Sequence, residues 1–296
     1  MNIIQVFQKF PTQESCIAYL EQARWPNGPV CPYCQSTHNN PTEKELRHFC
    51  YNCKTSFSVT VGTIFHRTHL PLQKWFLAVT LILNAKKGLS ALQLSRDLEV
   101  NKNTAWRIGM QIRKAMSQGE QRELLTGVVE MDETYVGGKP RKGNNRNDDM
   151  EGGNKSKRGR GTDKAPVIGA VSRGGKVTAK AVKKGKMKGK NLRAFVKETV
   201  DVLNSRLISD EYWGYMGMNR LLPHSVICHT YCYVDGDIHT NTIEGFWALL
   251  KRGMFGQFHS VSRKHLQKYV DEFCFRYNNR ANDNVFDLTI SKVLGV

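Results

Sequence analysis

The sequence predicts a mixed α/β protein whose largest domain follows a metal-binding ribbon and a helical region. Three observations support this fold class. Two Cys-x-x-Cys pairs lie near the N-terminus, apolar residues recur with helical spacing in the region that follows, and strand-like segments then alternate with helix-like ones. We therefore expect an N-terminal segment with the ribbon at 1–60, a helical region at 61–124 and an α/β domain at 125–296.

The charge balance indicates a polyanionic partner. The 296 residues include 44 Lys or Arg and 26 Asp or Glu, which gives a formal net charge of +18. Because 40% of the residues are hydrophobic, the chain should fold, and a disordered polyanion is excluded. A phosphate backbone is the usual partner of such an excess of positive charge, and a basic protein on a membrane surface is the alternative.

We expect a cytoplasmic protein without a membrane anchor. Its longest apolar stretch, residues 76–83, is far shorter than the roughly 20 residues that cross a bilayer. The first residues show no signal-peptide pattern. In a reducing compartment, cysteines are expected to bind metal or to be buried rather than to form disulfides.

The ribbon is predicted from the spacing of four cysteines. CPYC and CYNC are separated by fifteen residues, and each pair can hold two thiolates on one tight turn. Two such turns complete a tetrahedron around zinc, and a site with four protein ligands is structural rather than catalytic. The predicted Zn²⁺ ligands are Cys31, Cys34, Cys50 and Cys53, whereas Cys16, Cys228, Cys232 and Cys274 are expected to be buried thiols.

Residues 70–116 predict three helices. Pro71 suits the first position of a helix, and Ser90 with Gln93 resembles a capping box for a second one. A turn at 99–101 precedes a third helix with a polar outer face. This is the outline of a helix-turn-helix, whose third helix can enter a major groove, although a helical linker with a solvated basic face is the alternative. The residues predicted to contact DNA are Asn103, Arg107, Gln111 and Lys114.

The α/β domain is predicted from five strand-like segments. They occupy 128–132, 166–172, 177–182, 206–210 and 225–228, and helices are expected at 191–203, 242–252 and 262–278. The segment 137–164 interrupts this pattern, because it is rich in Gly, Lys and Arg and almost lacks apolar residues. We expect a flexible basic loop there, either a solvated insertion or an arm that contacts phosphates.

Acidic residues near predicted strand ends are the candidates for chemistry. Asp132 and Asp210 each close an apolar strand, and ligands gather at the carboxyl ends of strands in open α/β sheets. Two carboxylates placed this way suggest a cation between them, whereas either one alone could be a turn or cap residue. Glu130 lies on the same strand face as Asp132 and is the next candidate.

A third acidic candidate lies on the helix predicted at 242–252. Glu244 could be a metal ligand, with Lys251 two turns later as a phosphate contact. The alternative is structural, because Asn241 and Glu244 match a capping box with Asn241 as the N-cap. The apolar face of this helix consists of Ile243, Phe246, Trp247 and Leu250.

Several long motifs resemble the insertion-sequence transposases of the ISXO-like branch, which have a DDE catalytic triad. They are MDETYVGGK, SDEYWGY and HTNTIEGFWALLKRG, together with GRGTDKAPVIGAVSR and VSRKHLQKYVDEFCFRYNNR. The resemblance covers nearly the whole chain and includes the zinc ribbon. It implies a ribonuclease-H-like catalytic domain, in which a mixed five-stranded sheet is flanked by helices, and a polynucleotidyl transferase that uses two divalent metal ions.

The resemblance also implies roles for individual residues. The acidic triad falls on Asp132, Asp210 and Glu244, which would bind Mg²⁺ or Mn²⁺, and a basic residue seven positions later falls on Lys251. Some relatives use Asn in the third role, so Asn241 competes with Glu244. Three carboxylates that converge without metal repel one another, so at least one pKa should be raised. The expected partners are the terminal inverted repeats of the element, target DNA and further copies of the chain in a homo-oligomeric DNA complex, in association with a prokaryotic nucleoid.

Three functions remain open from the sequence. A DNA transposase would bind the terminal inverted repeats and catalyse metal-dependent phosphodiester hydrolysis and strand transfer. A non-catalytic zinc-ribbon DNA-binding regulator would explain the ribbon, the helices and the charge, but not the acidic residues. A nuclease of the ribonuclease H type would explain the acidic residues without any joining of strands.

Overall fold

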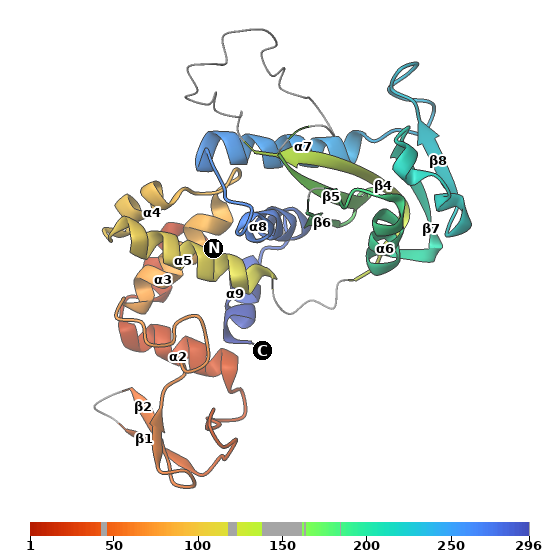
Figure 1. Ribbon diagram of the computed structural model, residues 1–296. Coiled ribbons are helices and arrows are strands. Elements are labelled where there is room, and N and C mark those ends of the chain that lie inside the picture. Colours follow the sequence, from red (N-terminus) through yellow and green to blue (C-terminus); the bar gives the residue numbers. More distant parts are fainter. Residues whose placement is uncertain (43–45, 118–122, 138–161, 163, 184, 296) are drawn as a thin grey trace, which may run out of the picture. The chain divides into compact units, whose positions relative to one another are not determined.

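The computed structural model describes residues 1–296 apart from 43–45, 118–122, 138–161, 163, 184 and 296 (Figure 1). It divides into two compact units, one of residues 1–120 with 279–296 and one of residues 121–278. Almost all of the predicted basic loop at 137–164 lies outside the described residues. Within the described part of the chain, no helix has both the length and the apolar character of a membrane span.

The first unit is built from helices around an aromatic core. Phe10, Phe76 and Phe286 contact one another with ring centroids 4.7 to 6.1 Å apart. Because Phe286 lies in the last helix, the chain returns to this unit at its C-terminal end, whereas the sequence predicts that all of 125–296 belongs to the α/β domain. The helices are α1 (Ile3–Lys9), α2 (Gln13–Arg24), α3 (Leu72–Asn84), α4 (Ala91–Leu98), α5 (Lys102–Ser117) and α9 (Val285–Leu294).

The three helices predicted at 70–116 are confirmed as α3, α4 and α5. Ser90 caps α4, since its hydroxyl oxygen accepts a hydrogen bond from the backbone N–H of Gln93 at 3.2 Å. Glu99 ends this helix in the left-handed conformation, with φ of 50°, and so produces the short turn before α5.

A ribbon of three antiparallel strands packs beside α2. Its strands β1 (Asn39–Thr42), β2 (Arg47–Cys50) and β3 (Thr55–Phe57) pair in that order. The guanidinium group of Arg24, at the end of α2, donates to the carbonyl oxygens of Val59 and Val61 at 2.6 and 2.7 Å. Glu21 contacts the buried His48 of β2 at 2.8 Å. The ribbon is therefore attached to α2 by two polar side chains.

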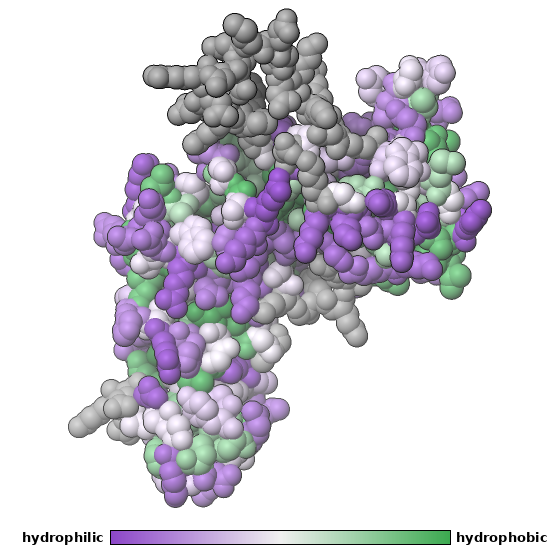
Figure 2. Space-filling view, viewed as in Figure 1, coloured by the Kyte–Doolittle hydropathy of each residue, from purple (hydrophilic) through white to green (hydrophobic). Residues whose placement is uncertain are grey.

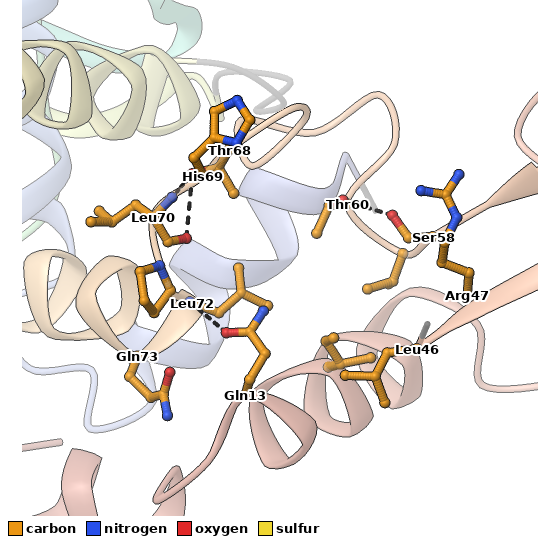
Figure 3. A pocket seen from close by; sticks show the side chains of 13 residues that line it. Gln13, Leu46, Arg47, Ser58, Thr60, Thr68, His69, Leu70, Leu72 and Gln73 are labelled. Carbon is orange, nitrogen blue, oxygen red and sulfur yellow. Dashed lines mark hydrogen bonds between the residues drawn. The ribbon is translucent and has the colours of Figure 1, made fainter. Parts of the chain in front are cut away.

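A cavity of about 530 Å³ lies between the ribbon, α2 and the segment that leads into α3. Figure 3 shows Gln13 of α2 reaching the start of α3, where its side-chain oxygen accepts from the backbone N–H of Leu72 at 2.8 Å. None of the residues that line the cavity is a predicted site residue. The cavity therefore does not indicate where chemistry takes place.

The second unit contains a mixed five-stranded sheet with the order β6-β5-β4-β7-β8. β4, β5 and β6 form an antiparallel meander, and β7 and β8 continue the sheet parallel to β4. This arrangement confirms the predicted ribonuclease-H-like fold. The elements are β4 (Leu125–Val136), β5 (Ala165–Ser172), β6 (Val177–Ala181), α6 (Gly189–Thr199), β7 (Val200–Asp210), β8 (His224–Ile227), α7 (Asn241–Gly253), a π-helical turn (Met254–Phe258) and α8 (Leu266–Asn278).

Two predicted boundaries in this unit are wrong. The helix predicted at 191–203 ends at Thr199, because Val200 already pairs with Leu125 of β4. The strand predicted at 128–132 continues to Val136, because β5 remains paired with it over that length. Asp132 therefore lies within a strand rather than at its end.

Alternation of side chains along β4 gives the sheet two different faces. Val129 and Met131 belong to an apolar core with Leu192 and Phe195 of α6. Glu130 and Asp132 lie on the opposite face, which α7 covers (Figure 1). The charged face of the strand is thus the one that receives α7.

Helix α8 covers the edge of the sheet at β6. The side-chain amide of Gln267 accepts from Ala181 N–H at 2.7 Å and donates to the Ala179 carbonyl at 3.2 Å. Asn278 accepts from Val177 N–H at 2.7 Å and donates to the carbonyl of the same residue at 3.0 Å. Because an amide carries both a donor and an acceptor, these two side chains replace a neighbouring strand at an edge that would otherwise be open to pairing.

Candidate active site and metal centres

Asp132 and Asp210 lie side by side on neighbouring strands. The parallel pairing of β4 with β7 ends where Met131 lies opposite Ser209, and each Asp is the next residue of its strand. Neighbouring strands run about 4.8 Å apart, so the two residues are adjacent across the sheet. The sequence could not show this alignment, because it depends on the register between strands far apart in the chain.

The carboxylate of Asp132 is oriented by two donors. Oδ1 accepts from the backbone N–H of Glu133 at 2.7 Å, and Oδ2 accepts from the indole N–H of Trp247 at 3.1 Å. The indole lies over Gly169, the residue paired with Asp132 on β5, and a Cβ at position 169 would lie 2.6 Å from the ring. The role of Trp247 was missed from sequence, although a Gly inside an apolar strand often marks such a close approach.

Burial and neighbouring acidic residues together raise the pKa of Asp132. Burial is the largest cause that raises the pKa of Asp132, and the charges of Glu133, Asp210 and Glu244 raise it further, to about 7. The predicted rise of at least one carboxyl pKa is thereby confirmed. Glu133 was not predicted as a member of this cluster, and it accepts a hydrogen bond from the buried Tyr215 hydroxyl at 2.9 Å.

Glu244 lies in the first turn of α7 with about half of its side chain exposed. The helix begins at Asn241, and its N-cap residue is Thr240, whose side chain makes no capping bond, so the proposed capping box with Asn241 as N-cap is wrong. The Thr240 hydroxyl donates to Glu244 Oε1 at 2.9 Å, and His229 Nε2 lies 3.8 Å from the same oxygen. Glu244 is therefore not occupied by capping and remains open on the solvent side.

Lys251 lies on the same helix, exposed to solvent, seven residues after Glu244. This spacing corresponds to two turns, or about 10 Å along the helix axis. The structure thus places a solvent-exposed cation on the helix that carries Glu244.

The donor set of the acidic cluster suits a hard divalent cation. Mg²⁺ and Mn²⁺ prefer carboxylate oxygens and complete their coordination with water and substrate phosphate. Burial, together with the charges of Glu133, Asp210 and Glu244, disfavours the ionised form of Asp132, and a bound cation would offset both effects. Within the described residues, however, the three carboxylates do not form a group as compact as that of the four cysteines.

The four predicted zinc ligands do converge. Their sulfur atoms all lie within 4.8 Å of one another, with Cys31 3.7 Å from Cys53 and Cys34 3.5 Å from Cys50. A tetrahedral zinc with Zn–S bonds of about 2.3 Å requires sulfur atoms about 3.8 Å apart, so the geometry fits this metal. Backbone N–H groups, above all that of Cys53, lower the pKa of Cys50 to about 6 and favour a thiolate.

The predicted DNA-contacting residues lie along α5. Asn103, Arg107 and Lys114 are exposed, and Gln111 is partly exposed. Trp106, which is not among the predicted contact residues, lies on the same helix with 44% of its surface exposed. The space-filling view in Figure 2 shows that hydrophilic residues cover most of the visible surface. The outer face of α5 therefore combines polar side chains with Trp106, while Ala105, Ile108 and Ile112 are buried.

A family profile for the ISXO2-like transposase domain matches residues 124–278, which is more than half of the chain. The chain belongs to the ISXO2-like transposase family. A second profile, for a transposase zinc-ribbon domain, matches residues 11–56, which contain all four cysteines of the ribbon. The function of the chain is thus that of a transposase, and the resemblance seen in its motifs is confirmed.

One curated relative is an uncharacterized protein in transposable element ISH50 of Halobacterium salinarum, 29% identical over 283 residues, or 90% of this chain and 91% of that protein. One similar solved structure is a Mos1 strand transfer complex, with 14% identity over 74% of this chain and 75% of that chain and a TM-score of 0.31. Another is a mariner Mos1 paired end complex with Mg, with 13% identity over 99% of this chain and 93% of that chain and a TM-score of 0.31. At these scores the structural likeness adds nothing to the fold assignment, which rests on strand order.

Proposed function

We propose that this transposase binds the terminal inverted repeats of its insertion sequence, hydrolyses phosphodiester bonds at the element ends and joins the freed 3′-hydroxyl group to target DNA. The observation that carries the proposal is the alignment of Asp132 with Asp210 across β4 and β7, with Glu244 close enough to raise the pKa of Asp132. A net charge of +18 supports DNA as the partner.

Asp132, Asp210 and Glu244 would hold Mg²⁺ or Mn²⁺ together with the scissile phosphate. Two such ions, when bound, supply Lewis-acid activation of the attacking oxygen and stabilisation of the leaving oxygen. Trp247 and the backbone N–H of Glu133 hold the Asp132 carboxylate in one orientation. Lys251 would contact a neighbouring phosphate of the DNA backbone.

Recognition of the element ends is assigned to the parts of the chain before the catalytic domain. The proposed division is 1–60 for the segment with its Zn²⁺ ribbon, 61–124 for the helix-turn-helix-like region and 125–296 for catalysis, although 279–296 pack within the first unit. Asn103, Arg107, Gln111 and Lys114 would contact DNA from α5. The active complex is proposed to contain more than one copy of the chain and to act at the prokaryotic nucleoid.

Cleavage and joining of oligonucleotides that carry the element ends, measured with Mg²⁺ or Mn²⁺, test this proposal. Asp132→Asn and Asp210→Asn should abolish both reactions. Glu244→Gln should abolish them as well, and it should change the free energy of unfolding by less than about 0.5 kcal/mol, because the side chain is half exposed and caps nothing. Glu123→Gln, in the exposed pair with Lys176, is the matched control and should remain active.

Normal activity of the Asp132 or Asp210 variant would contradict the proposed function. Salt-sensitive DNA binding by the native chain with no metal-dependent cleavage would identify a regulator instead. Nicked products that are never joined to a second DNA would identify a nuclease that only hydrolyses.

A further inference from the structure

We propose that Glu130 is a positioning residue, which fixes α7 and its residue Glu244 against the strand that carries Asp132. The inference rests on the proposed function, because it concerns the same acidic site. In this proposal Glu130 neither binds metal nor contributes to the apolar core, but holds α7 in place through hydrogen bonds.

Glu130 caps α7 from a distant strand. Its side chain is fully buried, and Oε2 accepts from the backbone N–H groups of Thr242 and Ile243 at 2.8 and 3.0 Å. Oε1 accepts from the hydroxyl of Thr242 at 2.8 Å. The first N–H groups of a helix have no partner within the helix, and the helix dipole favours a negative charge at that end. A residue 112 positions earlier thus supplies the cap that Thr240 does not.

Arg173 connects Glu130 to the segment before α7. Its Nε donates to Glu130 Oε1 at 2.7 Å, and its Nη2 donates to the carbonyl oxygen of His239 at 3.0 Å. The same nitrogen lies 3.1 Å from His239 Nδ1, which in turn lies 3.4 Å from Glu130 Oε1. A buried carboxylate requires such a partner, so the guanidinium group both stabilises Glu130 and restrains the chain that enters the helix.

Two contacts then fix the register of α7 along β4. Glu130 accepts a hydrogen bond from the backbone N–H of Thr242, and Asp132 accepts one from the indole N–H of Trp247. Two residues along a strand span about 6.6 Å, and five residues along a helix span about 7.5 Å, so the two contacts match in length. Glu244 lies between them in sequence. The position of Glu244 relative to Asp132 is therefore set by a contact on either side of it.

These contacts also exclude Glu130 as a metal ligand, the role for which it is the next candidate from sequence. Both of its oxygens accept hydrogen bonds from neighbouring groups, and no part of the side chain is exposed. Asp132 and Glu244 are at least partly exposed. Glu130 and Asp132 of β4 therefore differ in function, since Asp132 stays partly exposed and Glu130 holds the helix.

Glu130→Gln in the full-length chain tests the inference, with direct Mn²⁺ binding as the main readout. The amide keeps the shape of the side chain, but its NH₂ group opposes a donor of Arg173 or of the helix N-terminus. We expect Mn²⁺ affinity, measured from the electron paramagnetic resonance signal of the free ion, to fall about 10- to 100-fold, with a matching rise in the Mn²⁺ concentration needed for half-maximal cleavage. Affinity for element-end DNA without metal should not change.

Glu272→Gln is the control for a purely structural effect, because Glu272 is also fully buried and pairs with Arg276 on α8 at 3.3 Å. It should lower the melting temperature and leave Mn²⁺ affinity unchanged. If Glu130→Gln behaves in the same way below its melting temperature, the inference is overturned.

Two further variants keep the test decisive. If Glu130→Gln does not fold, Arg173→Lys retains the positive charge but cannot bond Glu130 and His239 together. It should weaken Mn²⁺ binding by a smaller factor, and unchanged binding would overturn the inference. Asp132→Asn serves as the reference: if it does not weaken Mn²⁺ binding, the proposed function itself fails, whatever Glu130 does.

Discussion

The two candidate metal sites of this transposase are held in different ways. The zinc ligands come from two short turns, and their sulfur atoms already lie at tetrahedral spacing. The acidic residues come from β4, β7 and α7, and they are brought near one another only by strand register and helix packing. The comparison shows that a site built from local turns is specified by spacing, whereas a site built from three elements depends on the residues that hold those elements.

The largest effect is expected at the cysteine site. Cys31→Ser should unfold the ribbon, because structural zinc contributes on the order of 10 kcal/mol to the folding of such small domains. Zinc content measured by atomic absorption should fall from about one ion per chain towards zero, and protease should cleave the region around 25–60.

The matched control is Cys232→Ser, which removes a half-buried thiol outside the ribbon and should leave the zinc content unchanged. Retention of zinc by Cys31→Ser would show that the four thiols do not act as one site. Binding of Mn²⁺ should be the same in both variants, since the acidic cluster uses none of these residues.

The next largest effect concerns the raised pKa of Asp132 and the pH dependence of stability that follows from it. The pKa of Asp132 is about 7, above its ordinary value of 3.8, so the unfolded chain releases this proton first as the pH rises. Between these two values the carboxyl group lowers the free energy of unfolding by about 1.4 kcal/mol per pH unit, and below pH 4 it has no effect. Asp132→Asn removes this term. In metal-free buffer, its stability relative to the native chain should therefore improve from pH 4 to pH 8.

Urea unfolding at several pH values, with EDTA present, would measure that difference. A gap between variant and native chain that does not change with pH would show that the pKa of Asp132 is not raised. Addition of Mn²⁺ at pH 8 should stabilise the native chain and leave the variant unchanged.

The smallest of the three effects concerns the packing that holds the acidic site. Gly169→Ala would place a Cβ 2.6 Å from the indole of Trp247, so the ring must shift. Overpacking of this kind costs about 1–3 kcal/mol of stability, and it should also release Asp132 from its donor and slow cleavage. Gly245→Ala is the control, because a Cβ on this exposed helical residue meets no atom within 4 Å.

Melting temperatures and cleavage rates of these two glycine variants test whether the Trp247 ring needs the space that Gly169 leaves. We expect Gly245→Ala to be neutral or slightly stabilising, as Ala is favoured over Gly in a helix. Equal behaviour of the two variants would mean that Trp247 does not depend on the space left by Gly169.

Much of the fold could be predicted because its signals are local. Ser90 caps α4 as expected, the apolar face of α7 is buried, and the order of strands and helices from 125 to 278 is confirmed. The end of α6 was misplaced by four residues, because helix-like residues there pair with β4. Local propensity yields to strand pairing when a neighbouring strand is present.

The candidate site could be predicted only in part. Motif resemblance pointed to Asp132, Asp210 and Glu244, but the capping box assigned to Asn241 and Glu244 was wrong, since Glu130 supplies the N-terminal partner of α7. The contact of Trp247 with Asp132 was also missed. Both contacts join residues more than a hundred positions apart, and no pattern of spacing within a single element contains them.

The residues alone predict a basic α/β protein that carries a zinc ribbon, and they single out a few acidic residues as candidate metal ligands. Those features follow from spacing, periodicity and charge, which act over a few neighbouring residues. Which carboxylate accepts from the first N–H groups of α7, which one stays partly exposed, and which unit receives α9 depended on the folded arrangement. The physical reason is that hydrogen bonding and burial assign a role to each side chain through neighbours that only folding brings close.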